Sequence, residues 1–245
     1  MKYIKKVGKY MGILRLPEDD KLIRSILPRV DYSNALTPDC SPELLAKTCD
    51  EALRFGFAAV AVYPMSIAYV AKRLEGSSTN PQLATGFPCG NHLTEVKLFE
   101  ARCGMDQGAK EVDMVISIQR FLAGDYNYVE DEIRQMVELC AGYNVGVKVI
   151  IEVGFLKNDE MKIKAGSLAV AGGAEFIKVG TGWWGRANCH DVELLVENFS
   201  DKAKIKASSG ILSLEDMATY ISIGAYKCAG RIEIVNQLDA MNFVL

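Results

Sequence analysis

Two lysines lie inside short apolar runs of the kind that form buried strands. Lys178 follows Phe-Ile and precedes Val-Gly-Thr-Gly, and Lys206 follows an isoleucine and precedes Ala-Ser-Ser-Gly. A lysine is almost never fully buried unless it is paired, so these positions indicate a functional use. An amine attacks a carbonyl carbon only when neutral, and both burial and a neighbouring ammonium group lower the pKa of a lysine from about 10.4. The pair therefore predicts amine catalysis on a carbonyl compound, in which a protonated imine weakens the adjacent C–C bond.

Further charged residues fall on the same kind of strand face. Asp113 and Lys148 each lie on the charged face of an otherwise apolar run, and strand side chains alternate between two faces. We expect the aliphatic faces to pack under helices and the charged faces to point into a barrel. That arrangement would gather Asp113, Lys148, Lys178 and Lys206 into one interior cluster, with Asp113 relaying protons. The alternative is a structural ion-pair network that fills the barrel.

These positions belong to a regular alternation of β and α segments. The expected strands are residues 29–32, 58–63, 82–87, 111–116, 147–153, 176–180, 205–208 and 226–230. The expected helices are residues 42–55, 95–104, 129–143, 159–171, 191–198 and 214–223. Eight βα units in 245 residues predict a fold of the α/β class, a closed (β/α)8 TIM barrel. The turns after Lys178 and Lys206 would then lie at the C-terminal mouth, where such barrels hold their sites.

The expected organisation is a single domain. We expect residues 29–245 to form the barrel and residues 1–28, which begin with a basic stretch, to form a short helical extension. This extension is expected to be solvated, and the alternative is a helix at a membrane surface. A doubly wound open sheet is the structural rival, but no G-x-G-x-x-G sequence follows the first strand.

Composition narrows the function further. The net charge of −3 argues against general binding to nucleic acid, and no apolar run approaches the roughly 20 residues of a membrane span. The seven cysteines are scattered without a C-x-x-C pair, which is typical of reduced thiols in a cytoplasmic protein. His92 and His190 lie far apart, so we expect no metal site, and the imine chemistry needs no cofactor.

Four segments, taken in order, give the chain a family resemblance. They are residues 108–116 (GAKEVDMVI), 147–152 (VKVIIE), 176–182 (FIKVGTG) and 205–210 (IKASSG). In these segments the chain resembles the deoxyribose-phosphate aldolases, class I Schiff-base aldolases on a (β/α)8 barrel. The resemblance, from residue 31 to about 238, implies that Lys178 forms the Schiff base and that Lys206 lowers its pKa. It also implies that Asp113 relays protons and that Lys148 is an electrostatic member of the site.

The substrate-binding turns depart from the family pattern. Ser208-Ser209-Gly210-Ile-Leu replaces a turn that usually ends Gly-Gly-Ile/Val-Arg. The last strand leads into Gly230-Arg231, where the family usually has Gly-x-Ser-Ser around the substrate phosphate. We expect backbone N–H groups in these turns to hold a phosphate, with an arginine supplying the lost contacts. The substrate-binding residues predicted on this basis are Gly182, Arg186, Ser209, Gly210, Gly230 and Arg231.

Three functions remain open from the sequence. The first is cleavage of 2-deoxyribose 5-phosphate or a similar sugar phosphate to acetaldehyde and glyceraldehyde 3-phosphate. The second is a related Schiff-base aldolase or acyl-transfer enzyme acting on a different keto or non-phosphorylated sugar, and the third is a sugar-phosphate-binding protein without turnover. Trp183 and Trp184 form either a packed turn or an aromatic wall of the pocket. A homo-oligomer is expected, as for many such barrels.

Overall fold

The computed structural model describes residues 20–245, and they form a closed parallel barrel. The basic residues that we expected to lie in a solvated extension fall outside the described residues, so the boundary at residue 28 stays a prediction. The eight strands are β1 Val30–Tyr32, β2 Ala59–Val62, β3 Asn80–Thr85, β4 Glu111–Val115, β5 Gly146–Ile150, β6 Phe176–Lys178, β7 Lys204–Ala207 and β8 Lys227–Gly230. Each strand pairs with its neighbours in chain order, and β1 closes the barrel against β8.

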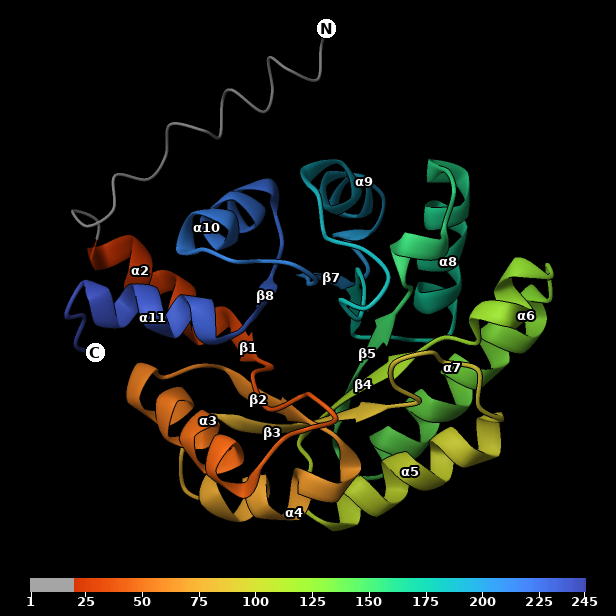
Figure 1. The fold of residues 1–245 in the computed structure, drawn as a ribbon. Coiled ribbons are helices and arrows are strands. Elements are labelled where there is room, and N and C mark those ends of the chain that lie inside the picture. Colours follow the sequence, from red (N-terminus) through yellow and green to blue (C-terminus); the bar gives the residue numbers. More distant parts are fainter. Residues whose placement is uncertain (1–19) are drawn as a thin grey trace, which may run out of the picture.

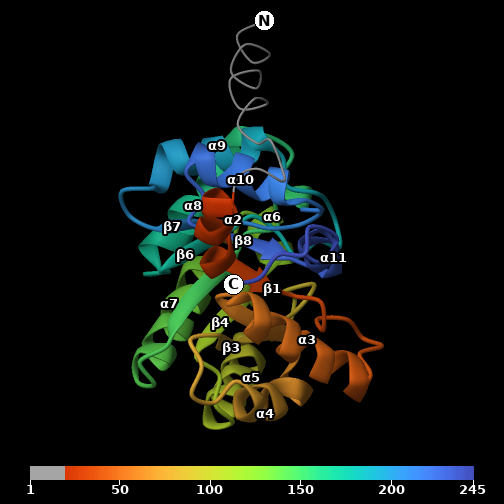
Figure 2. The ribbon, with the colours of Figure 1, turned by 90° about the vertical axis from the view of Figure 1, so that its left-hand side faces the viewer.

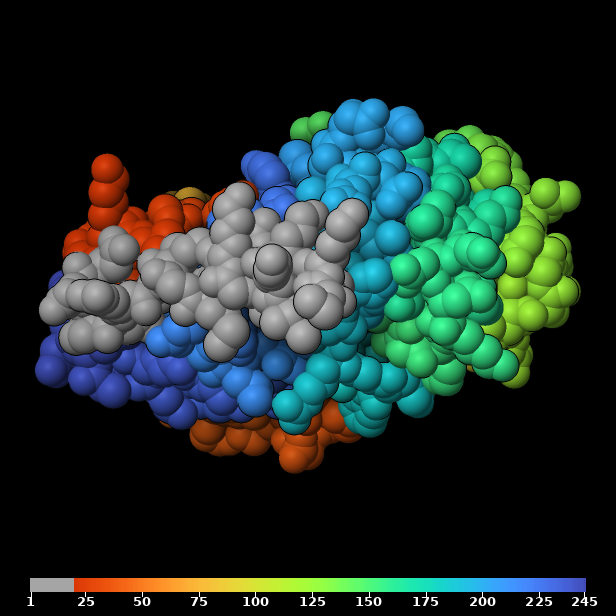
Figure 3. Space-filling view, turned by 90° about the horizontal axis from the view of Figure 1, so that it is seen from above, coloured from red at the N-terminus to blue at the C-terminus, as the bar shows by residue number. Residues whose placement is uncertain are grey.

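Helices surround the strands in chain order (Figures 1 and 2). They are α2 Asp20–Ile26, α3 Pro42–Phe55, α4 Pro64–Arg73, α5 Thr94–Asp106, α6 Ile118–Leu122, α7 Tyr126–Ala141, α8 Asp159–Ala171, α9 Cys189–Phe199, α10 Leu214–Ile223 and α11 Ile232–Ala240. Two 3-10 turns, η1 Leu27–Arg29 and η2 Val153–Phe155, complete the elements. On one side of the barrel α8, α9 and α10 pack next to one another, which Figure 3 shows from above.

Local signals set the starts of several helices. The side chains of Ser41, Asn158, Asn188 and Ser213 each accept a hydrogen bond from a backbone N–H in the first turn. These caps satisfy donors that a helix cannot pair internally. Each of these four helices begins directly after a loop at the C-terminal mouth, so the cap fixes the residue at which that loop ends.

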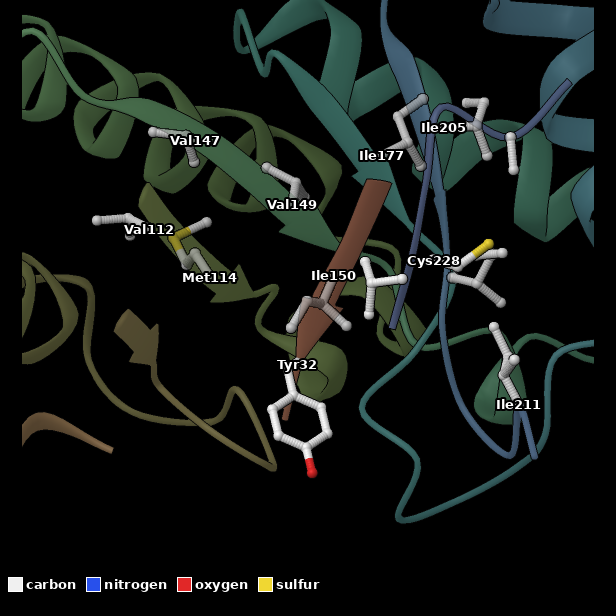
Figure 4. Close-up of a cluster of buried hydrophobic side chains, with 14 of the residues drawn as sticks. Tyr32, Val112, Met114, Val147, Val149, Ile150, Ile177, Ile205, Ile211 and Cys228 are labelled. Atoms are coloured by element: carbon white, nitrogen blue, oxygen red, sulfur yellow. The ribbon is translucent and has the colours of Figure 1, made fainter. Parts of the chain in front are cut away.

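The strand alternation expected from the sequence is present. Figure 4 shows Val112, Met114, Val147, Val149 and Ile177 in the buried apolar layer, and all of them belong to this core. Their neighbours Asp113, Lys148 and Lys178 point to the opposite, interior face, where they contact one another. The predicted TIM barrel is therefore confirmed, together with the inward direction of the charged strand faces.

The largest differences from the expected elements concern short or early segments. All eight strands are present, but several end before the predicted residue, because the chain turns into loops at the mouth. The helices α4, α6 and α11 had no counterpart among the expected helices. Of these, α6 has only five residues, and α4 begins two residues after β2, so neither gives a separate periodic signal. No helix among residues 20–245 is long and apolar enough to cross a membrane.

A buried ion pair outside the barrel joins α5 to α7. The Lys97 ammonium group donates to Glu132 Oε2 at 2.8 Å, to the Val115 carbonyl at 2.9 Å and to Ser117 Oγ at 3.2 Å. Glu132 also accepts from the Ser117 backbone N–H. Both charged side chains are essentially inaccessible to solvent. This cluster fixes the segment that follows β4, the strand that carries Asp113.

Candidate active site

Two lysines share one carboxylate oxygen inside the barrel. Lys178 Nζ lies 2.7 Å from Asp113 Oδ2, and Lys206 Nζ lies 3.0 Å from the same atom. Lys178 and Lys206 are also register partners at the adjoining positions of β6 and β7. Lys148 Nζ lies 3.4 Å from the other oxygen of Asp113. The four residues predicted from strand patterns therefore form one contiguous cluster.

The cluster extends to three residues that sequence reasoning did not place in it. Asp31 contacts Lys206 at 2.5 Å and Lys227 at 3.0 Å, and Lys227 also contacts Glu111 at 3.0 Å. Glu111 is in turn bonded to Lys148. A signal was available for Glu111, which shares the strand face of Asp113. Asp31 and Lys227 lie on β1 and β8, the first and last strands, which become neighbours only when the barrel closes.

Burial and neighbouring charges act in opposite directions on this network. Burial lowers the pKa of Lys206 to about 8, and the nearby Lys178 and Lys148 add to this, although Asp113 and Asp31 oppose it. Burial alone would lower the pKa of Lys148 too, but Asp31, Asp113 and Glu111 together raise it. Burial would raise the pKa of Asp113, but the surrounding lysines hold it well below its usual range. These directions favour the charged forms of Asp113 and Lys148 at neutral pH. Of Lys148 and Lys206, Lys206 releases its proton more readily.

The charge count of the network favours one neutral amine. Among the described residues, the network contains four lysines and three carboxylates, which are Lys148, Lys178, Lys206, Lys227, Asp31, Glu111 and Asp113. Full protonation would leave one more positive than negative charge among these seven largely buried residues, and the nearby carboxyl of Glu152 has a pKa that burial raises. Loss of one lysine proton removes this excess. The arrangement thus supplies what nucleophilic amine chemistry requires.

A cavity of about 530 Å³ opens above the two lysines. Lys178 and Lys206 lie at its floor, where Lys178 is 5% exposed and Lys206 is 1% exposed. Asp113 and Lys148 are not part of the lining and lie beneath it. Below them, the buried Phe176 ring lies 5.6 Å from Lys148 Nζ and 5.9 Å from Lys227 Nζ. Phe176 and this charged layer close the N-terminal end of the barrel.

Most of the predicted substrate-binding residues line this cavity. They are Gly182, Arg186, Ser209, Gly210 and Arg231. Gly230 is not among the lining residues, and its carbonyl accepts hydrogen bonds from the backbone N–H and the hydroxyl of Ser33. A Cβ atom at Gly230 would point outward against Val30 and Met217. Gly230 therefore shapes the turn, and Arg231 is the residue of this pair that faces the cavity.

The turns at the mouth contain unusual backbone conformations. Ser209 has φ of 91° although it is not glycine, and its buried hydroxyl has no hydrogen-bond partner in the described structure. Glu152, with φ of 51°, accepts a hydrogen bond from the Thr181 N–H at 2.8 Å. Burial raises the pKa of Glu152, although the bonds from Thr181 and the charge of Lys178 oppose this rise. Such strained residues cluster at functional sites, and here they flank the turn after Lys178.

Other reactive residues do not join the site. Cys189 and His190 lie at the start of α9, and the His190 ring contacts the Asp159 carboxylate at 2.8 Å. His92 is exposed in the segment between β3 and α5, outside the cavity lining. Within residues 20–245, no group of three or more His, Cys, Asp or Glu side chains is arranged to hold a metal ion. The charged side chains that line the cavity are Asp31, Lys178, Arg186, Lys206, Arg231 and Glu233.

A parallel eight-stranded barrel with a lysine pair at the cavity floor defines the class of protein, a barrel enzyme that acts on carbonyl carbon. Comparison with known proteins gives the family. A family model described as DeoC/LacD family aldolase matches residues 25–223. The chain belongs to this family and is an aldolase.

Relatives of known name cover most of the chain. A deoxyribose-phosphate aldolase of Clostridium kluyveri is 38% identical over 217 residues, which are 87% of this chain and 98% of that protein. One from Thermococcus gammatolerans is 39% identical over 199 residues, covering 80% of this chain and 88% of the relative. Among solved structures, an aldolase called QR15 superposes with a TM-score of 0.82 at 27% identity, covering 89% of this chain and 97% of its own.

Solved structures of lower identity show the fold alone. A putative deoxyribose-phosphate aldolase from Coccidioides immitis has a TM-score of 0.82 at 24% identity, covering 97% of both chains. The tetrameric deoxyribose phosphate aldolase from Aeropyrum pernix has a TM-score of 0.81 at 24% identity, covering 94% of this chain and 99% of that one. Together these matches confirm the family and the barrel predicted from the sequence.

Proposed function

We propose that this chain is a class I deoxyribose-phosphate aldolase, which cleaves 2-deoxyribose 5-phosphate reversibly to acetaldehyde and glyceraldehyde 3-phosphate. The observation that carries the proposal is the contact of Lys178 and Lys206 with the same oxygen of Asp113 at the cavity floor. The names of the relatives support the choice of substrate. The reaction needs a neutral amine and a proton relay, and these residues provide both.

Lys178 is the proposed nucleophile because it is the less constrained lysine. It contacts one carboxylate and is the more exposed of the pair, whereas Lys206 contacts both Asp31 and Asp113. Lys206 shares the Asp113 oxygen with Lys178, and its pKa of about 8 makes it neutral in a larger fraction of molecules than an ordinary lysine, so it is the proposed acceptor of the Lys178 proton. This role adds a proton transfer to the one implied by the family resemblance, in which Lys206 lowers the pKa of Lys178.

The proposed steps balance in atoms and charge. The neutral amine of Lys178 adds to the aldehyde carbon of the open-chain sugar. The resulting hydroxyl takes a proton from the Lys206 ammonium group through Asp113, which the final hydrolysis returns, and water leaves to give a protonated imine. A base then removes the proton of the C3 hydroxyl, the C2–C3 bond breaks, and its electron pair forms an enamine. Glyceraldehyde 3-phosphate leaves, the enamine takes a proton at C2, and water hydrolyses the imine to release acetaldehyde and restore the amine.

The test is reductive trapping. Incubation with acetaldehyde and borohydride should attach a stable two-carbon group to Lys178, located by mass spectrometry of peptides. Lys178→Leu should give no adduct. Lys204→Leu should still give one, because Lys204 lies at the N-terminal end of β7, away from the cavity, where it pairs with Glu175. Absence of an adduct in the natural protein, or an adduct that persists in Lys178→Leu, would contradict the proposed chemistry.

A second candidate function concerns the far end of the substrate. Glu233 lines the cavity close in sequence to Arg231, and a carboxylate at this position opposes the binding of a phosphate. This observation favours a related Schiff-base aldolase acting on a non-phosphorylated or keto substrate. Rates of cleavage of 2-deoxyribose 5-phosphate and of 2-deoxyribose decide between the two. A preference for the phosphorylated sugar would remove the need for the second candidate.

The proposal includes self-association and a cytoplasmic setting. Five large apolar side chains are exposed on α4, on α5 and just before α5, namely Met65, Tyr69, Leu93, Val96 and Phe99. Patches of this kind mark interfaces, and a structural relative is described as tetrameric. A second copy of the chain is the proposed occupant, and Phe99→Asp should lower the mass measured by light scattering. The seven free cysteines support a reducing compartment.

A further inference from the structure

The outer part of the cavity carries apolar groups that the proposed reaction does not use. The lysines lie at the floor, and a phosphate would be held by backbone N–H groups and arginines. The remaining lining of the mouth includes Leu36, Pro38, Phe87, Trp183, Ile211 and Leu212. Trp183 is 52% exposed and Leu212 is 42% exposed. An indole that faces a cavity without covering partners is a binding surface for an apolar group.

The loop that carries Trp183 is held in place by contacts of its other residues. The next residue, Trp184, packs on Phe155 with ring centroids 5.3 Å apart. The carbonyl of Trp184 lies against Gly154, where a Cβ atom would come within 2.0 Å of it. These contacts direct Trp184 away from the cavity and fix the N-terminal half of the loop between β6 and α9.

The other half of the same loop is fixed against the turn after β7. The Ala187 N–H donates to the Ser209 carbonyl at 2.9 Å, and the Tyr220 hydroxyl donates to the Ala187 carbonyl at 3.0 Å. The Trp183 N–H donates to Thr181 Oγ1 at 3.2 Å. The loop is therefore anchored on both sides of Trp183, so the backbone that carries the indole is preorganised and a ligand orders only the side chain.

The size of the cavity also exceeds the need of a small sugar phosphate. Its volume of about 530 Å³ lies in the range of roughly 300–1,000 Å³ typical of pockets for drug-sized ligands. A five-carbon sugar phosphate is smaller than such ligands. Its reacting end lies at the lysines, so the unused volume lies toward the mouth, where Trp183 is.

We propose that Trp183 is a specificity-determining residue that lets the enzyme accept aldehydes with an apolar, preferably aromatic, tail. This inference rests on the proposed aldolase function. In the synthetic direction, the enamine formed from acetaldehyde on Lys178 attacks the carbonyl carbon of the second aldehyde. One C–C bond forms, the carbonyl oxygen takes a proton, and hydrolysis of the imine releases a 3-hydroxyaldehyde. The tail of the second aldehyde stacks on the indole of Trp183.

The test compares propanal with 3-phenylpropanal, which carries an added ring, as acceptors for acetaldehyde. The natural protein should convert 3-phenylpropanal to 3-hydroxy-5-phenylpentanal with a lower KM than that for propanal. Trp183→Ala should lower kcat/KM for 3-phenylpropanal about tenfold through KM, the effect of one lost ring contact. The value for propanal should stay within about twofold, and Trp183→Phe should restore most of the difference.

Trp184→Phe is the matched control, because it retains a ring against Phe155 outside the cavity. It should leave the preference unchanged. The inference would be overturned if both Trp183 variants lowered kcat/KM equally for propanal and 3-phenylpropanal. It would also be overturned if neither variant lowered kcat/KM for 3-phenylpropanal. The trapping experiment tests the aldolase proposal separately from the role of Trp183. An acetaldehyde adduct without a preference for the ring contradicts only the role of Trp183, whereas no adduct contradicts the aldolase proposal and this inference with it.

Discussion

Asp113 holds two lysines through a single oxygen, and its closest counterpart is Asp31. Asp113 contacts Lys178, Lys206 and Lys148, whereas Asp31 contacts Lys148, Lys206 and Lys227 but not Lys178. Both carboxylates are buried. The pair therefore allows the loss of a buried charge to be separated from the loss of the proton relay.

We expect Asp113→Asn and Asp31→Asn to differ in catalysis but to agree in stability. Each should lower the free energy of unfolding by about 3–5 kcal/mol, because lysines are left without a buried partner. Asp113→Asn should also lower kcat by about 10²–10⁴-fold through loss of proton transfer. Denaturant unfolding and steady-state kinetics measure the two effects. Equal kcat values in the two variants would show that Asp113 has no special part in proton transfer.

Lys206 gives a pH dependence with a definite sign. Its pKa is lowered from 10.5 to about 8, so between these values the unfolded chain holds a proton that the native protein has released. Lys206 therefore contributes stability that increases as pH rises through this window. The free energy of unfolding should rise less between pH 8 and pH 10 in Lys206→Met than in the natural protein. An identical rise in both proteins would contradict the lowered pKa.

The same lysine predicts the rate profile. If neutral Lys206 accepts the proton of Lys178, kcat/KM should increase with pH up to about 8 and then level off. The increase should be absent from the residual activity of Lys206→Met. A profile of retro-aldol cleavage across this pH range, with trapped adduct as the measure of active protein, checks the expectation.

At the scale of elements, the ion pair between Lys97 on α5 and Glu132 on α7 fixes the segment after β4. Removing one partner leaves the other charged and buried, so Lys97→Met should lower the free energy of unfolding by about 3–5 kcal/mol. The double variant Lys97→Met with Glu132→Met should recover part of this loss, because no buried charge remains. Thermal and denaturant unfolding measure both. A double variant that is less stable than Lys97→Met would contradict this account.

The sequence predicted elements best where a periodic pattern was long enough to be seen. The helices α3, α8 and α10 have the expected bounds, and each begins after a side chain that caps it. The charged face of β4 led to Asp113, and single lysines in apolar runs led to Lys178 and Lys206. Asp31 and Lys227 were not predicted as members of the cluster, because β1 and β8 lie at opposite ends of the chain and become neighbours only when the barrel closes.

Long-range pairing was beyond the reach of local patterns. The ion pair of Lys97 with Glu132 joins residues that are 35 positions apart, and no spacing in the sequence indicates it. The sequence also did not predict which residue of the turn after β8 faces the cavity. Arg231 faces the cavity and Gly230 does not, although they are neighbours, because Gly230 ends β8 with its carbonyl bonded to Ser33.

At the scale of the whole molecule, closure of the barrel creates the electrostatics of the site. β1 pairs with β8, which places Asp31 beside Lys227 and within reach of Lys206. An open sheet would leave the first and last strands apart and would separate Asp31 from Lys206 and Lys227. Closure also buries Lys206, and this burial lowers its pKa while Asp31 opposes the shift, so the pKa of Lys206 depends on the closed topology as well as on the residue itself.

The sealed lower end of the barrel, where Phe176 lies under Lys148 and Lys227, has a kinetic consequence. The active-site cavity therefore opens only at the C-terminal mouth, and both fragments leave through that opening. The fragment bound to Lys178 lies deepest, and the other fragment lies above it. The larger aldehyde must therefore depart first and acetaldehyde last, and synthesis must load them in the reverse order. Product-inhibition patterns should follow this fixed sequence, and a random pattern would mean that the floor opens during turnover.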